Sequence, residues 1–160
     1  TMCGVFYRDF GIDTRIVRIF NTYGPRIGAE DGRVIPSFVM SAMKNEPMKV
    51  FGDGTQTRSY CYVSDLIEGI VRLSLEPKAK GETVNIGNPG EFTVTETAEI
   101  IWKEVHGDSS EAKIDYKPLP GDDPTRRRPD ITKAQQLLGW EPEVSFAEGL
   151  KKTVAWFREQ

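Results

Sequence analysis

Apolar residues recur at a spacing of three to four along several stretches of the chain, and this period predicts amphipathic helices. Polar residues that cap helices stand at the start of most of these stretches. Helices are therefore predicted over residues 1–10 and 34–44, from a Ser64 cap, from a Thr93–Glu96 capping box to about residue 106, from an Asp130 cap to Gly139, and from a Ser145–Glu148 capping box onward.

Shorter β-branched or alternating runs between these helices predict strands. They cover residues 14–20, 48–51, 57–63, 83–86 and 113–117, and glycine-rich turns separate several of them. Strands and helices mix without a regular βαβ rhythm, and the strands are few and short. The pattern indicates an α/β chain made of a small α+β lobe and remnants of a neighbouring α/β domain.

Composition restricts the function classes. The chain has 160 residues, 38% of them hydrophobic and 28% charged, with a net charge of −3. These values are typical of a soluble globular protein, and we expect neither nucleic acid nor membrane as a partner. With one histidine and two separated cysteines, no metal site is expected. The absence of a signal peptide and of disulfide spacing favours a cytoplasmic location.

The first candidate site follows the strand of residues 14–20. Asn21, Thr22 and Tyr23 stand at its end, before a Gly-Pro turn. Ligands bind at strand ends in open α/β sheets, and an Asn side chain offers both donors and acceptors to a hydroxyl or phosphate oxygen. A structural Asn that closes a turn would give the same pattern.

Two further segments place arginine in constrained surroundings. Arg58 follows a turn bracketed by Gly52 and Gly54, which suits bidentate binding of a phosphate, although this segment taken alone favours a hairpin with a surface arginine. Residues 126–128 are three consecutive arginines in a loop stiffened by prolines. Such a run is usually a solvated face, but here we expect one arginine to point inward.

Carboxylates and nucleophile motifs add little. We interpret Asp53, Asp65, Asp122 and Asp123 as turn and cap residues rather than as an acid/base pair. The sequence contains no GxSxG, Walker A or GxGxxG motif.

Taken in order, the segments resemble a known family. The order is R-I-F-N-T-Y-G-P-R, D-G-R-V-I-P-S-F, V-F-G-D-G-T-Q-T-R-S-Y-C-Y-V-S-D-L, N-I-G-N-P and D-D-P-T-R-R-R-P-D-I. It is similar to that of the extended short-chain dehydrogenase/reductases, the NAD-dependent epimerase/dehydratase family. D-G-R-V-I, G-T-Q-T-R-S-Y and D-D-P-x-x-R-x-P-D-I favour its UDP-glucuronate decarboxylases. The dTDP-glucose 4,6-dehydratases and nucleotide-sugar 4-epimerases remain alternatives on the same scaffold.

The resemblance implies a role for individual residues. Arg58 and Arg127 would clamp the diphosphate of a UDP-sugar, with Tyr62 in support, and Asn21 would contact the diphosphate or the sugar. Thr22 and Arg33 would lie beside the NAD cofactor. The segment from Val34 to Phe38 and the strand of Lys49, Val50 and Phe51 would enclose the uracil and ribose.

The resemblance also implies how the work is divided. Residues 1–23 would be the tail of the Rossmann-type NAD domain, and residues 24–160 the nucleotide-sugar-binding lobe. By the same resemblance, the glycine-rich NAD loop and the catalytic Tyr-x-x-x-Lys pair would lie upstream. Tyr7 is no substitute, because the fourth residue after it is Gly11 and not lysine. No catalytic residue is therefore assigned in this chain, which we expect to be inactive alone. The parent enzyme would oxidise C4 of the glucuronate, release CO₂ and reduce the product again.

Two alternatives remain for how this chain associates with other molecules. The parent enzyme is expected to be a homodimer. In a different class of answer, the chain is a non-catalytic fragment that binds nucleotide sugar or self-associates through apolar surface.

Overall fold

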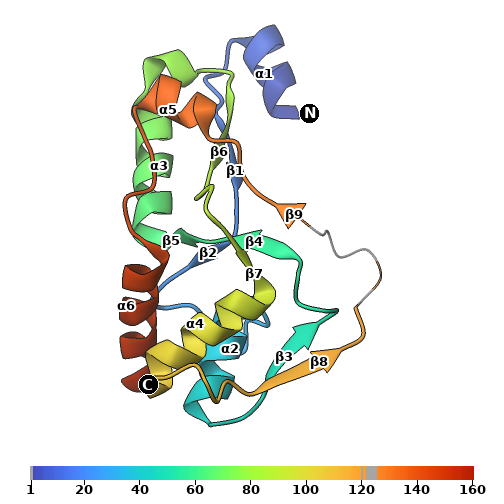
Figure 1. Cartoon of the computed structure of the whole chain (residues 1–160). Helices are drawn as coiled ribbons and strands as arrows, with labels where there is room; N and C mark the ends of the chain where they lie inside the picture. The colour runs from blue at the N-terminus through green and yellow to red at the C-terminus, as the bar shows by residue number, and fades with distance from the viewer. Residues whose placement is uncertain (1, 120, 122–125) are drawn as a thin grey trace.

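The computed structural model describes residues 2–119, 121 and 126–160. In these residues the helices are α1 (Met2–Phe10), α2 (Val34–Met43), α3 (Val63–Leu75), α4 (Val94–His106), α5 (Thr132–Leu138) and α6 (Phe146–Arg158), with a 3₁₀ turn at Pro77–Ala79. The strands are β1 (Ile16–Ile19), β2 (Thr22–Tyr23), β3 (Met48–Phe51), β4 (Thr57–Ser59), β5 (Cys61–Tyr62), β6 (Thr83–Ile86), β7 (Glu91–Thr93), β8 (Ile114–Lys117) and β9 (Arg126–Arg127) (Figure 1).

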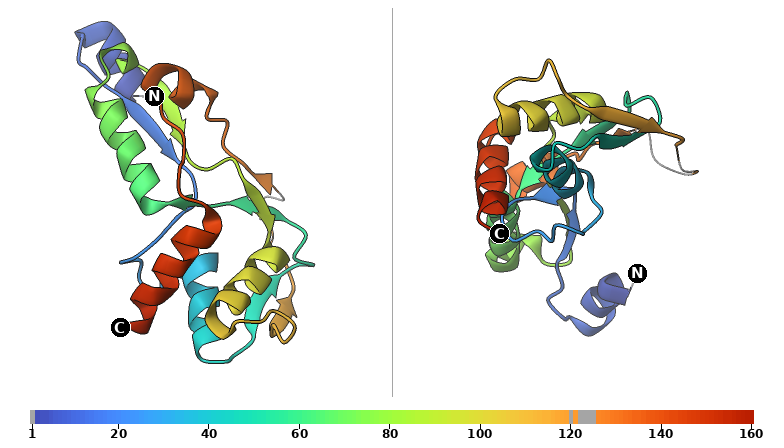
Figure 2. Two further views of the ribbon diagram at one scale, coloured as in Figure 1. Left: turned by 60° about the vertical axis from the view of Figure 1, so that its left-hand side comes forward. Right: turned by 90° about the horizontal axis from the view of Figure 1, so that it is seen from below.

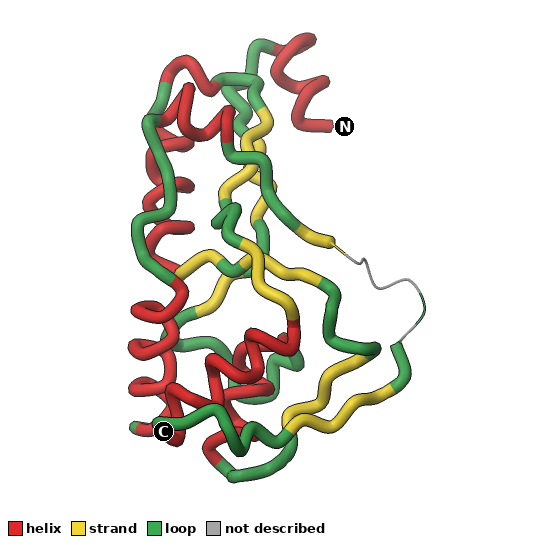
Figure 3. The backbone as a smooth tube through the Cα atoms, in the orientation of Figure 1, coloured by secondary structure: helices red, strands yellow, loops and turns green. Residues whose placement is uncertain are grey.

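The strands form small sheets that are mostly parallel. β1 pairs with β6, β2 with β5 and β3 with β8, each pair in parallel, and the order β7-β4-β9 gives one three-stranded sheet. Figure 3, in the orientation of Figure 1, shows α3 and α6 along one side of the molecule, β3 and β8 paired on the opposite side, and most of the other short strands between them. The mixed α/β class expected from the sequence is confirmed.

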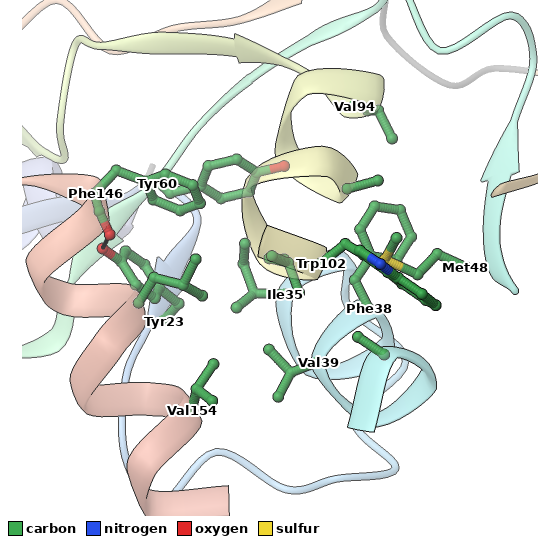
Figure 4. Packing of buried hydrophobic residues seen from close by; sticks show 14 of the residues in the cluster. Tyr23, Ile35, Phe38, Val39, Met48, Tyr60, Val94, Trp102, Phe146 and Val154 are labelled. Carbon is green, nitrogen blue, oxygen red and sulfur yellow. Dashed lines mark hydrogen bonds between the residues drawn. The ribbon is translucent and has the colours of Figure 1, made fainter. Parts of the chain in front are cut away.

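One hydrophobic core lies among α2, α4 and α6, at the lower end of Figure 1. Val39, Val50, Ile101 and Leu150 are fully buried there because the apolar faces of the helices meet one another and β3. Figure 4 shows the side chains of this core at close range.

A second core joins β1 and β6 to α3 and α5. Val84 and Ile86 on β6 are fully buried, and Trp140, just after α5, donates its indole N–H to the carbonyl of Asp65 at 3.0 Å. β1 thus packs with elements far along the chain. The predicted domain boundary at residue 23 stays a prediction.

The helix α1 stands apart from both cores. None of its residues is buried, and Figure 2 shows it at one end of the molecule. It is held by a hydrogen bond from Thr14 Oγ1 to the Cys3 carbonyl and by the Tyr7 ring, which lies against Gly81. No described helix has both the length and the apolar character needed to cross a membrane.

The helix caps differ in part from the sequence predictions. The Thr93–Glu96 capping box of α4 is confirmed in both of its hydrogen bonds. At α6, Ser145 accepts from the Glu148 N–H, which is one half of the predicted box. The Ser64 cap is wrong: α3 begins at Val63 with Tyr62 at the cap position and no side-chain bond, because strand β5 runs directly into the helix. Asp130 accepts from the Thr132 N–H although Ile131 holds the cap position.

Candidate functional site: a groove between β2, β4 and the start of α2

Three adjoining hollows form one groove, and Thr22 and Arg33 line all three. The smallest, about 180 Å³, is lined by Asn21, Thr22, the segment Gly32 to Pro36, Arg58, Tyr60 and Arg127. The other two measure about 630 Å³ and 430 Å³. The groove therefore brings together residues that are more than a hundred positions apart in sequence.

The paired strands β2 and β5 position Asn21 and Thr22 in the groove. They pair in parallel with Thr22 opposite Cys61, and the Asn21 carbonyl accepts the Cys61 N–H at 2.8 Å. Thr22 donates its hydroxyl to the Phe20 carbonyl at 2.9 Å. The bond from Cys61 fixes the Asn21 backbone, and the Asn21 side chain, which lines the smallest hollow, carries both a donor and an acceptor.

Two arginines face the groove from neighbouring strands. Arg58 on β4 and Arg127 on β9 are direct register partners. Side chains of such partners share one face of a sheet, so the two guanidinium groups lie on the same side. Arg58 is 7% exposed and donates from Nη1 to the Thr57 carbonyl at 2.8 Å, which holds its side chain in place. A pair of adjacent cations is the arrangement that binds a phosphate or diphosphate.

The first turn of α2 adds a third positive element. Its cap position is Arg33, and no side chain caps the helix. The first N–H groups of an α-helix have no partner within the helix and carry partial positive charge. Val34 and Ile35, the first two helical residues, both line the smallest hollow. The helix start therefore favours an anion at the same place as the arginines.

Arg33 itself is held by a local ion pair. Its Nε and Nη2 donate to the two carboxylate oxygens of Asp31, the latter at 2.8 Å. This hydrogen bonding lowers the pKa of Asp31 and raises the pKa of Arg33, so both stay charged. Since Arg33 lines every hollow of the groove, the pair fixes a cation at its centre.

Aromatic side chains of the hydrophobic core pack around Tyr23, which directly follows Thr22 (Figure 4). Tyr23 packs edge-on against Tyr60, Tyr62 and Phe146, and its hydroxyl donates to the Phe146 carbonyl at 3.2 Å. Burial raises the pKa of Tyr23 far above its ordinary value, so the hydroxyl stays protonated. The first residue of α6 is thereby tied to the strand end that carries Asn21 and Thr22.

Most of the predicted site residues meet in this groove. Asn21, Thr22, Arg33, Val34, Arg58 and Arg127 line its smallest hollow, and Tyr62 lines the largest. The predicted uracil and ribose contacts lie elsewhere. Phe38 and Val50 are buried in the lower core, and Lys49 and Phe51 are exposed on β3 outside these hollows. Their contact with a ligand stays a prediction.

Tyr60 lines the groove and was missed by the sequence reasoning. It stands two residues after Arg58, so the two-residue period of a strand would have placed it near the same face. The expectation of one inward arginine in the run 126–128 is met only in direction: Arg127 lines the groove, but all three side chains are exposed.

Asp53 is a turn residue as predicted, but the prediction is wrong for Asp65, which is neither a turn nor a cap residue: it lies within α3 and binds a segment more than seventy residues away. Asp53 accepts from the N–H and hydroxyl of Thr55 within a turn, and Asp65 accepts from the N–H groups of Glu143 and Val144. Asp122 and Asp123 lie outside the described residues. Among those residues no cluster of metal-ligating side chains is found.

The sequence of this fold matches a known protein family. Residues 1–153 match the family described as GDP-mannose 4,6 dehydratase, and the chain belongs to that family. This confirms the family predicted from the motifs.

Individual relatives narrow the comparison. UDP-glucuronic acid decarboxylase 1 of Arabidopsis thaliana is 50% identical over all 160 residues, which cover 36% of that protein. Among solved structures, the epimerase Mth375 of Methanothermobacter thermautotrophicus superposes with a TM-score of 0.90 at 35% identity, over 99% of this chain and 47% of that one. The UDP-glucuronic acid 4-epimerase of Bacillus cereus, in complex with UDP-glucuronic acid and NAD, gives 0.87 at 30% identity, over 99% and 49%.

The chain matches only part of each relative. The chain spans about a third of the curated relative's length and about half of each of the two solved structures.

Proposed function

We propose that this chain forms the nucleotide-sugar-binding part of an NAD-dependent UDP-glucuronate decarboxylase. The observation that carries the proposal is the register pair of Arg58 and Arg127 beside the uncapped start of α2. The 50% identity with a UDP-glucuronic acid decarboxylase supports the choice of substrate. The diphosphate would lie between the two arginines and the helix start, and Asn21 would hydrogen-bond the diphosphate or the sugar.

We infer that an NAD cofactor would lie beside Thr22 and Arg33. Thr22 donates its proton to Phe20, which leaves the lone pairs of its oxygen to accept, and Arg33 supplies a fixed cation. These two groups fit the edge of a cofactor that carries both an amide donor and phosphates. When bound, NAD would take up a hydride from C4 of the sugar and return it. The residues of this chain hold and orient the nucleotide sugar for that exchange.

The proposal is tested by titrating the purified chain with UDP-glucuronate, UDP, dTDP and uridine. We expect weak binding, with UDP at least roughly tenfold tighter than uridine, because the diphosphate supplies the charge-assisted hydrogen bonds. Equal affinity for UDP and uridine would remove the diphosphate site from the account. Preference for dTDP over UDP would favour a dTDP-glucose dehydratase.

The chain alone is expected to bind without turnover. Incubation with UDP-glucuronate and NAD should release no CO₂. Measurable decarboxylation would contradict the proposal that this chain binds the nucleotide sugar without catalysing the reaction. A 4-epimerase is the second candidate, favoured by the Bacillus cereus neighbour. The complete enzyme distinguishes the two, because a decarboxylase releases CO₂ from UDP-glucuronate and an epimerase retains the carboxylate.

A further inference from the structure

A single carboxylate connects all three strands of the β7-β4-β9 sheet. Glu91 belongs to β7, at one edge. Its Oε1 accepts from Thr57 Oγ1 on β4 at 2.8 Å and from Arg126 Nε on β9 at 2.9 Å. Its Oε2 accepts from Arg126 Nη2 at 2.7 Å. The Glu91 side chain thus spans the central strand β4 and binds Arg126 on β9.

The strand that Glu91 binds is short. β9 has two residues, and in the described part of the chain Ser59 Oγ also donates to the Arg127 carbonyl at 2.9 Å. Two residues of ladder give little stability of their own. The bidentate contact between Glu91 and Arg126 is therefore a large part of what fixes β9 against β4.

Side chains alternate between the two faces of a strand, so fixing the side chain of Arg126 also fixes the side to which Arg127 points. Arg126 is the register partner of Thr57 and lies on the Glu91 face. Successive side chains of a strand point to opposite faces, so Arg127 points to the other side, with Arg58. That is the side of the groove.

Glu91 also forms ion pairs with two of the three arginines at residues 126–128. Arg128 Nη1 lies 3.7 Å from its carboxylate, so both neighbours of Arg127 share one counter-ion. Hydrogen bonds from Arg126 and Thr57 lower the pKa of Glu91 to about 2, so it is charged at neutral pH. Among the described residues no ion pair involves Arg127, which lines the groove.

We propose that Glu91 is the positioning residue that holds Arg127 in the groove, by fixing Arg126 on the opposite face of β9. The inference rests on the proposed function, in which Arg127 binds the diphosphate of a nucleotide sugar. Glu91 itself touches no ligand in this account.

The decisive variant is Glu91→Asp. It keeps the charge, so the electrostatic field on the anion is unchanged, but it is one methylene shorter and cannot reach both Thr57 and Arg126. The matched control is Glu82→Asp, the same change at an exposed glutamate that pairs with Lys133 outside the groove. Both are made in the wild-type chain and in Arg127→Ala. UDP affinity is read by NMR titration, and thermal midpoints are compared.

Glu91→Asp should weaken UDP binding by roughly 3- to 10-fold in the wild-type background and add no further loss to Arg127→Ala. Glu82→Asp should bind like the wild type. Unchanged affinity in Glu91→Asp, or an equal loss in both backgrounds, overturns the proposal, because a merely structural role would not depend on Arg127.

A second measurement tests the role of Glu91 independently of UDP binding. If the folded wild-type chain binds no UDP, amide hydrogen exchange of β9 still decides about Glu91. Faster exchange in Glu91→Asp than in Glu82→Asp supports the positioning role, and equal exchange overturns it.

Discussion

Arg58 and Arg127 are register partners on the parallel strands β4 and β9, and both line the same small hollow. Two guanidinium groups on one face of a sheet repel each other unless an anion lies between them. The uncapped start of α2 opens onto the same hollow. These three positive elements, supplied by distant parts of the chain, define the candidate diphosphate site.

Replacing either arginine should weaken UDP binding. Arg58→Ala and Arg127→Ala should each cost about 1.5–3 kcal/mol, or about 10- to 140-fold in Kd, the range for a hydrogen bond to a charged group. Isothermal calorimetry or NMR titration measures the effect. The control is Arg8→Ala, an exposed arginine on α1 far from the groove, which should bind UDP like the wild type. Wild-type affinity in both groove variants would remove the arginine clamp from the account.

The close approach of α6 to Tyr23 should make Gly149 sensitive to substitution. A Cβ at this position would lie 2.3 Å from the Tyr23 hydroxyl and 2.7 Å from a Tyr62 ring carbon. Gly149→Ala should therefore destabilise the chain by about 1–3 kcal/mol, the usual cost of overpacking, in urea unfolding. Gly28→Ala is the matched control, because a Cβ there meets open space without a left-handed backbone. Equal stability of the two variants would show that α6 is not packed this tightly on the strand ends.

The charge on Glu91 predicts a pH-dependent stability. Its pKa is lowered from 4.5 to about 2 by Arg126 and Thr57, so the contribution is fully present above the ordinary value and is lost as the pH falls toward 2. The thermal midpoint of the wild type should exceed that of Glu91→Gln at neutral pH, and the gap should close in acid. A gap that stays constant over this range would show that the charge is not what stabilises the contact.

The two cysteines should differ in reactivity. Cys61 is fully buried and its pKa is raised to about 12 by burial, so it stays a neutral thiol at about pH 8. Cys3 is exposed on α1. A thiol reagent should label one cysteine in the native chain and both in denaturant, as counted by mass spectrometry. Rapid native labelling of Cys61 would show that the β2–β5 pair opens.

Much of the fold follows from local patterns. The apolar period of residues 34–44 and the Thr93–Glu96 capping box each predicted a helix that forms, because both signals act within a few residues. The Ser64 cap failed because the chain passes straight from β5 into α3, a tertiary feature that no local signal reports. The parallel pairing of β1 with β6 likewise depends on packing between segments more than sixty residues apart.

The candidate site was predictable only through the family resemblance. Local chemistry gave Asn21 an equally plausible structural role and favoured a structural role for Arg58, and nothing in the arginine run distinguished Arg127 from its neighbours. The distinction comes from strand register and from Glu91, which binds Arg126 and leaves Arg127 on the other face. The sequence reasoning gave Glu91 no role, since its partners lie more than thirty residues away.

Self-association of the chain stays a prediction. Large apolar side chains are exposed on α1 and α3, among them Met2, Phe10, Ile67 and Leu75. Such surface favours association of copies or contact with a further domain. Size-exclusion chromatography over a concentration series should show a dimer or larger species, and a monomer at every concentration would count against it.

The structure of the chain crystallised with UDP is the most direct test of the nucleotide-sugar site. We expect the diphosphate to lie between the Arg58 and Arg127 side chains, with an oxygen against the first N–H groups of α2. UDP bound elsewhere, or a groove without UDP at saturating concentration, would contradict it.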